Sequence, residues 1–225
     1  SEAPGDSAFE PPEYATSLTD LGNAERFVRD NADALRYVAP WKKAPWLEWD
    51  ETRWGNDLRL HVVERAKKTV RGLYREAADI EDTERRKRLL DRARKSEHVQ
   101  RVTAIVNLGA SDPKLSVLPN QMDTDPLSLN VLNGTIDLRT GRLRRHSRED
   151  VITKLAPVTY DPEAKCPLFE VFLHRVMGGN STLITYLRRV LGYCLCGDIT
   201  EQAIWVFHGD GDNGKSTLMT TLHQI

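Results

Sequence analysis

The sequence predicts an α+β protein, in which a mainly helical accessory domain with small β-hairpins precedes the first strand, loop and helix of a truncated α/β P-loop domain. Three observations lead to this fold class. Apolar residues recur at helical spacing through most of residues 19–106. Short apolar runs flank two glycine-containing turns, at 133–134 and 140–141. A further apolar run, 203–207, stops at a glycine-rich turn that is followed by a helical pattern.

Composition narrows the class of protein. The chain has 225 residues, of which 40% are hydrophobic, so it can bury a core. Its 32 lysines and arginines nearly balance 33 aspartates and glutamates, so any nucleic-acid binding must depend on local basic surfaces. The sequence shows neither a transmembrane run nor a leader pattern. We therefore expect a soluble protein without a membrane partner, in the cytoplasm or another reducing compartment.

Four segments are expected along the chain. Residues 1–18 are acidic and proline-rich and are predicted to be a disordered linker. Residues 19–160 form the accessory domain, and 161–200 form a helical collar that could mediate oligomerisation or pack within the chain. Residues 201–225 start a P-loop ATPase domain, and because the chain stops soon after the loop we expect a fragment of a longer protein.

The accessory domain is expected to open with a helix over 19–38 that Thr19 or Asp20 could cap. A small hairpin follows at 46–54, where three of four clustered tryptophans flank a polar turn. These tryptophans could form a small core or stack on nucleobases, and the usual role of aromatic residues favours the core.

Two further helices are predicted, over 56–78, with Leu58 on the buried stripe, and over 81–106, the second divisible near Ser96. Residues 65–101 carry thirteen lysines and arginines against seven aspartates and glutamates. These basic side chains could contact the phosphate backbone of a nucleic acid. Alternatively, they could belong to a solvent-exposed helix face on which opposite charges pair. The DNA-binding candidates in this region are Arg85, Arg86, Lys87, Arg88 and Arg92.

A proline-rich loop over 110–128 leads to hairpins centred on the turns at 133–134 and 140–141. Within the loop, Asp123 and Asp125 are interpreted as turn formers. Basic residues surround the second turn and make it another candidate DNA surface, with an ordinary exposed turn as the alternative. The candidates there are Arg142, Arg144 and Arg145.

The remaining elements are a strand over 151–160 and helices over 167–176 and 182–195. The three cysteines, Cys166, Cys194 and Cys196, are an odd number, which favours a reducing compartment. The Cys194–Cys196 pair could suggest a metal site, but no further His or Cys pair lies nearby in sequence to complete it, so buried free thiols are expected for this pair.

The strongest functional signal is the sequence GDGDNGKST at 209–217, directly after the apolar run. Its glycines lack a Cβ, so the backbone can approach a triphosphate and surround it with N–H groups. We expect Lys215 to contact the β- and γ-phosphates as the catalytic residue and Ser216 to ligate Mg²⁺. The candidate residues for ATP and Mg²⁺ are Gly209, Asp210, Gly211, Asp212, Asn213, Gly214, Lys215, Ser216 and Thr217.

A resemblance to a known family rests on the segments 22–27, 36–38, 46–50, 53–54, 130–138 with Gly141, 152–154, 192–193 and 213–217. In these segments the chain resembles the phage and plasmid DNA primase-helicase family, the satellite-phage and poxvirus type of superfamily 3 helicase. A typical member has glycine where this chain has Glu51.

This resemblance implies a ring-forming, ATP-driven replicative helicase, a homo-hexamer in its full-length form, that acts on single-stranded or forked DNA and often follows a primase domain. The present chain would be the accessory region ahead of the motor, and we expect it to lack ATPase activity by itself. Two other functions would use the same loop or surfaces. A P-loop small-molecule kinase would need a substrate pocket but no basic surface, whereas a non-catalytic DNA-binding or oligomerisation module would bind DNA with or without ATP.

Overall fold

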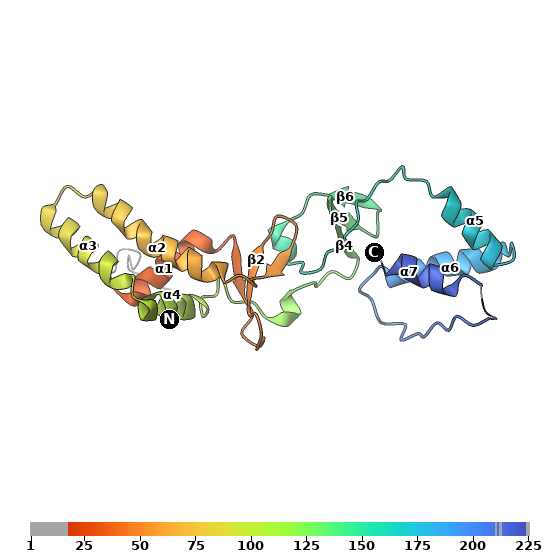
Figure 1. Ribbon diagram of the computed structural model, residues 1–225, viewed down its shortest axis with the longest axis horizontal. Coiled ribbons are helices and arrows are strands. Elements are labelled where there is room, and N and C mark those ends of the chain that lie inside the picture. The colour runs from red at the N-terminus through yellow and green to blue at the C-terminus, as the bar shows by residue number, and fades with distance from the viewer. Residues whose placement is uncertain (1–17, 210, 212, 224–225) are drawn as a thin grey trace, which may run out of the picture. The chain divides into compact units, whose positions relative to one another are not determined.

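The computed structural model describes residues 18–209, 211 and 213–223. The chain divides into two compact units. The first, here called the helical unit, comprises the residues up to Trp49 together with Gly55–Pro119, and the second, the hairpin unit, comprises Asp50–Trp54 and the residues from Asn120 onward. Helices and two small three-stranded antiparallel sheets confirm the predicted α+β class (Figure 1). The expected boundaries at residues 160 and 200 stay predictions.

Helix α1, Asp20–Asn31, begins where Thr19 accepts a hydrogen bond from the backbone N–H of Gly22 at 3.1 Å, as the sequence predicted. The helix ends seven residues earlier than expected, because Leu35–Tyr37 forms strand β1 instead. This strand pairs with β2, Trp46–Trp49, and its Leu35 side chain is fully buried. Pairing and burial of β1 therefore override the helical spacing of its apolar residues.

Three more helices complete the helical unit: α2, His61–Ala78; α3, Thr83–Ser96; and α4, Val99–Gly109. The break near Ser96 is confirmed, but the helix expected over 56–78 starts only at His61. Asp57 accepts the N–H groups of His61 and Val62, both at 2.8 Å, and so caps α2, while Leu58 is 79% exposed. Helices α1 and α3 both pack against α2, and α4 packs against all three (Figure 1).

The core of the helical unit lies between α1, α2, α4 and the β1–β2 pair. Phe27 and Trp46 pack edge to face with their ring centroids 6.3 Å apart. The other buried residues of this core are Val28, Leu35, Val62, Ala66, Val70, Val102, Ile105, Val106 and Leu115. A smaller cluster of Leu73, Ala77, Leu89 and Ala93 joins α2 to α3.

Two helical glycines in this unit provide a matched test of packing. A Cβ on Gly109 would lie 2.8 Å from Cδ1 of Phe27, whereas a Cβ on Gly72 would meet nothing within 4 Å. We expect Gly109→Ala to lower the free energy of unfolding by about 1–2 kcal/mol through overpacking. Gly72→Ala should raise it by about 0.5–1 kcal/mol through helix propensity. Chemical denaturation of both variants measures the difference, and equal effects would contradict the close α1–α4 packing.

The hairpin unit contains strands β4, Ser128–Val131; β5, Gly134–Asp137; and β6, Arg142–Arg144, in that sheet order. The turn at 140–141 is confirmed, since Asp137 lies opposite Arg142. The first hairpin also forms, but Val131 lies opposite Gly134, so Leu132 and Asn133 make its turn, one residue earlier than predicted, and Gly134 begins β5. Single-turn 3₁₀ helices lie at Pro119–Gln121 and Arg148–Asp150.

The strand predicted over 151–160 is wrong. This segment makes only an isolated bridge between Val131 and Ala156. Val151 has a left-handed φ of 49°, and Pro157 has no N–H to donate, so a continuous ladder cannot form.

The third strand of the other sheet, β3, Trp54–Asn56, confirms the tryptophan hairpin. Trp54 is 1% exposed, and its indole N–H donates to the carbonyl of Arg148 at 2.9 Å. Trp46 is also buried, so the core interpretation holds for both residues. The hairpin turn places Glu51 at a φ of 74°, the left-handed conformation that glycine adopts without strain.

Three helices follow: α5, Pro167–Val176; α6, Ser181–Cys194; and α7, Lys215–Leu222. Leu173, Ile184, Leu187 and Leu218 form their common core. All three cysteines are free, but the pair expected to be buried is not: Cys194 is exposed and Cys196 is half-buried, and Cys166 is also exposed. Cys166 precedes α5 and Cys194 ends α6, where helix packing has stopped. No helix among the described residues is long and apolar enough to span a membrane.

Candidate nucleotide loop and nucleic-acid interface

The loop before α7 depends on two glycines with positive φ angles, Gly209 at 153° and Gly214 at 79°. Gly214 is the N-cap residue of α7, and a Cβ at this position would lie 2.6 Å from Cγ1 of Val176 and 2.9 Å from Cε2 of Phe172. Both the backbone conformation and the close approach to α5 therefore require glycine at position 214.

Lys215 closes this loop. Its ammonium group donates to the carbonyl oxygen of Gly209 at 2.9 Å and to Oδ1 of Asn213 at 2.8 Å. The N-cap residue has no side chain, so it makes no side-chain cap at the start of α7. The loop thus holds one positive charge beside the positive end of a helix dipole.

The other predicted loop residues are less enclosed. Ser216 and Thr217 are exposed in the first turn of α7, Gly211 is also exposed, and Asn213 is half-buried. Asp210 and Asp212 lie outside the described residues. The structure therefore brings Gly209, Asn213 and Lys215 together and leaves Ser216 accessible to solvent.

The strand expected at 203–207 does not form. Ile204 is 89% exposed and Val206 is 78% exposed, and no neighbouring strand pairs with this segment within the described residues. A strand without a ladder leaves its backbone N–H and C=O groups to water, which explains the irregular conformation. The segment instead borders a pocket of about 340 Å³ that Trp205, Phe207, Tyr186 and Lys215 help to line.

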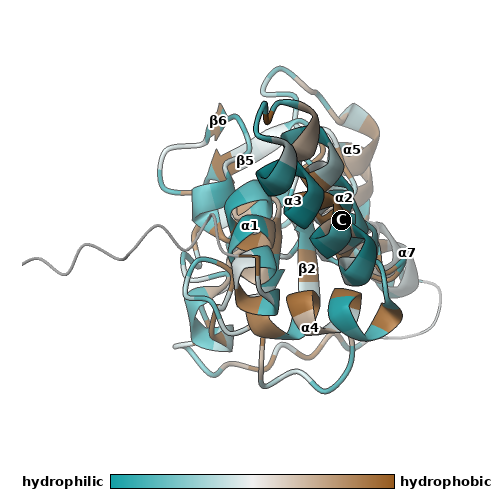
Figure 2. Ribbon diagram, turned by 90° about the vertical axis from the view of Figure 1, so that its left-hand side faces the viewer, coloured by the Kyte–Doolittle hydropathy of each residue, from teal (hydrophilic) through white to brown (hydrophobic). Residues whose placement is uncertain are grey.

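Helix α3 carries the larger of the two basic surfaces. Arg85, Arg86, Lys87 and Arg88 are all exposed, and none forms an ion pair within the described residues. Lys95 is also exposed and lies two turns after Arg88, on the same side of the helix. Figure 2 shows that most residues of α3 are hydrophilic (teal).

Arg92 has a different role from its neighbours. Its side chain is 13% exposed and pairs with Asp20 at 2.5 Å, and Arg101 donates to the same carboxylate at 3.0 Å. These bonds join α3 and α4 to the start of α1. We therefore leave Arg92 out of the set that could contact phosphate.

The β5–β6 hairpin has fewer available cations than its composition suggests. Arg144 pairs with Asp150 at 2.6 Å, and Arg139 pairs with Asp125 at 2.7 Å. Asp125 also accepts the N–H of Leu127, so its turn-forming role is confirmed. The hydrogen bond from Arg139 holds the pKa of Asp125 far below its ordinary value. Exposed Arg142 and Arg145 remain without an ion pair among the described residues.

Comparison with known families gives one match. Residues 24–178, more than half of the chain, match the family described as D5 N terminal like. The chain belongs to this family. A comparison with curated proteins found no match.

Membership of the D5 N terminal like family identifies a domain related to the N-terminal region of phage and poxvirus primase-helicases and places it in the context of DNA replication. The matched residues include all of α3 and the β4–β6 sheet, and they end before the loop at 209–217.

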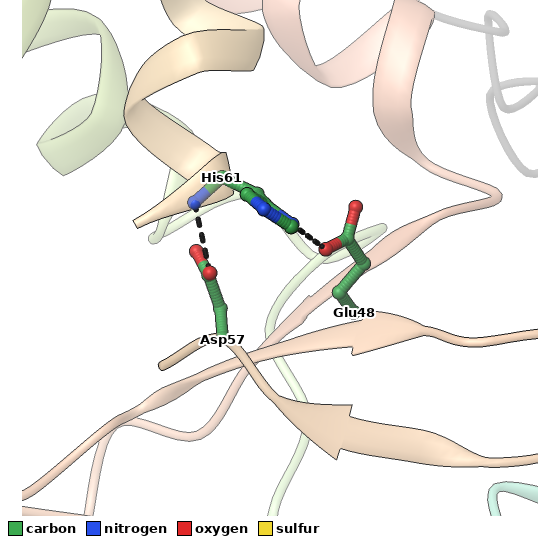
Figure 3. Close-up of side chains that lie close together, drawn as sticks. All are labelled: Glu48, Asp57 and His61. Carbon is green, nitrogen blue, oxygen red and sulfur yellow. Dashed lines mark hydrogen bonds and ion pairs between the residues drawn. The ribbon is translucent and has the colours of Figure 1, made fainter. Parts of the chain in front are cut away.

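The D5-like domain also contains a side-chain cluster that the sequence pattern did not suggest. Potential ligand atoms of Glu48, Asp57 and His61 lie within 4.8 Å of one another, as in many metal sites (Figure 3). Glu48 Oε2 lies 2.6 Å from His61 Nδ1, and its Oε1 accepts from Arg65, also at 2.6 Å. Asp57 accepts two backbone N–H groups, at His61 and Val62.

These bonds explain the cluster without an ion. Each carboxylate oxygen of the cluster already has a donor at hydrogen-bond distance, and the Arg65 guanidinium neutralises Glu48. The side-chain bonds of Glu48 to His61 and Arg65 therefore join β2 to the first turns of α2. The signal available in the sequence was His61 and Arg65 at i, i+4 after a capping aspartate, but nothing local indicated Glu48 as their partner.

This network should stabilise the fold in a pH-dependent way. Burial alone would raise the pKa of Glu48, but hydrogen bonds from Arg65 and His61 outweigh it and lower that pKa below 4.5. We expect Glu48→Gln to reduce the free energy of unfolding by about 1 kcal/mol at pH 7. Because the folded-state pKa is depressed, the difference from the native chain is complete above 4.5 and disappears as the pH falls through the folded-state value.

Urea denaturation across this pH range measures the effect. Glu163→Gln is the matched control, since Glu163 is exposed and its carboxylate forms no ion pair within the described part of the chain. Equal stability of the native, Glu48→Gln and Glu163→Gln chains at pH 7 would show that the bonds of Glu48 to His61 and Arg65 contribute nothing to the free energy of unfolding.

Proposed function

We propose that this chain is the DNA-binding accessory region of an ATP-dependent replicative helicase, followed by a loop that binds ATP with Mg²⁺. The observation that carries the proposal is the position of the Lys215 ammonium group between Gly209 and Asn213, beside the N-terminus of α7. A triphosphate is a strong, charge-assisted hydrogen-bond partner for an ammonium group. Nucleotide binding would therefore draw Lys215 onto the β- and γ-phosphates.

The remaining loop residues support the same chemistry. The positive φ angles of Gly209 and Gly214 let the backbone approach an anion, and Ser216 presents an exposed hydroxyl in the first turn of α7, where it would ligate Mg²⁺. In the complete helicase, a homo-hexameric ring, hydrolysis at this site would drive translocation along DNA.

Two separate DNA surfaces are proposed, one in each unit: the exposed cations of α3 in the helical unit, and Arg142 and Arg145 on the hairpin of the hairpin unit. Exposed cations without carboxylate partners can neutralise phosphates without first breaking ion pairs. This distribution favours contacts to the backbone of single-stranded or forked DNA over reading of base sequence.

A filter-binding titration, with a nucleotide titration in parallel, tests both DNA binding and ATP binding. Labelled single-stranded and forked oligonucleotides are titrated with the chain over a range of salt, with and without ATP and Mg²⁺, and a fluorescent ATP analogue is titrated in parallel. We expect DNA affinity to fall steeply with salt and the ATP analogue to bind only when Lys215 is present. Undetectable DNA binding at low salt would favour the small-molecule kinase, whereas DNA binding without any ATP binding would favour a non-catalytic module.

A further inference from the structure

The N-terminal segment has a charge opposite to that of α3. Residues 1–17 contain Glu2, Asp6, Glu10 and Glu13 and no lysine or arginine. The same segment contains two aromatic residues, Phe9 and Tyr14. It precedes Leu18, the first described residue, and so enters the helical unit at a position that the structure defines.

That position is beside the basic surface. Leu18 lines a pocket of about 360 Å³ together with Ile80 and Leu89, which supply apolar walls, and with four charged residues, Arg26, Arg29, Glu76 and Arg85. Arg26 pairs with Glu76 and Arg29 with Asp30, whereas Arg85 has no ion pair among the described residues. Arg85 is the first of the exposed cations of α3, and Leu89 belongs to the same helix. The pocket therefore offers an apolar surface and positive charge where the acidic segment joins the fold.

The segment is long enough to follow the whole of α3. A helix of 14 residues is about 21 Å long. A fully extended chain covers about 3.3 Å per residue, so Glu13 can reach about 17 Å from Leu18 and Glu10 about 26 Å. Both carboxylates can thus contact cations from Arg85 to Lys95.

We propose that residues 1–17 bind in cis to this pocket and to the exposed cations of α3, and so compete with DNA for that surface. The competition with DNA rests on the proposed function, whereas the docking itself does not. Single exposed ion pairs are weak, but the tether supplies an effective concentration on the order of millimolar. Salt screens such pairs, so docking should be strongest at low ionic strength.

Carbodiimide cross-linking tests the docking without DNA, because this reagent joins a carboxylate directly to a lysine amine. Lys87 and Lys95 are the lysines of α3. We expect cross-links from Glu10 or Glu13 to these two lysines at low salt, with a yield that does not change on dilution. Equal cross-linking to the exposed Lys42 and Lys43, or cross-links that form only between chains, would overturn docking in cis.

A pair of double variants tests the competition. Glu10→Gln with Glu13→Gln should tighten binding of single-stranded DNA about threefold at ~50 mM salt and have little effect above ~200 mM. Glu163→Gln with Glu201→Gln removes two exposed charges elsewhere and should leave affinity unchanged. DNA binding that is equal in the two variants would overturn the competition, and cross-links without any DNA binding would overturn the proposed function while supporting the docking.

Discussion

In the helicase that we propose, replacing Lys215 by alanine is expected to lower DNA-stimulated ATPase activity by about two to three orders of magnitude. The substitution removes the ammonium group that bonds to Gly209 and Asn213, close to where negative charge would develop during phosphoryl transfer. Turnover of ATP measured with saturating single-stranded DNA gives the effect directly.

Two controls separate chemistry from loop structure. Lys165→Ala removes another exposed lysine from the same unit and should retain full activity. Lys215→Arg keeps the charge and should bind the ATP analogue better than the alanine variant does, although its shape differs. ATPase activity of Lys215→Ala at the native level would remove Lys215, and nucleotide use by this loop, from the proposed function.

Replacing Arg85, Arg86, Lys87 and Arg88 by alanine is expected to weaken binding of single-stranded DNA about a hundredfold at ~0.1 M salt. Four fewer phosphate contacts should also reduce the slope of log K against log salt by about three. Alanine has the highest helix propensity, so α3 should remain folded, and circular dichroism checks this.

The matched control removes four exposed cations elsewhere: Lys42, Lys43, Lys165 and Arg189. None of these pairs with a carboxylate within the described ranges, so both variants change the net charge equally. The control should retain most of its affinity. A salt slope for the α3 variant equal to that of the native chain would place the DNA contacts on another surface.

The elements that were predicted correctly from the sequence are stabilised by residues close to one another in the chain. Thr19 caps α1 through a contact three residues away, and the glycine at 134 closes its hairpin through its own backbone conformation. Gly209 and Gly214 have the positive φ angles that glycine adopts without strain, whereas nucleotide binding by their loop stays a prediction.

The predictions from sequence were wrong where contacts with residues far away in the chain decided the structure. Leu35 follows a helical spacing but pairs with Glu48 in a sheet, and Arg92 belongs to a basic run but bonds to Asp20, 72 positions earlier. Glu48 itself binds Arg65 and lies against His61 across the chain.

By itself, then, the sequence determined the fold class, the capped start of α1, the presence of the hairpins and the presence of two basic stretches. Only the tertiary structure decided which of those cations are available to a partner, because an ion pair between residues far apart in the chain depends on how the helices pack. A charged side chain next to a distant carboxylate is a structural contact, and the same side chain facing water is available for a phosphate.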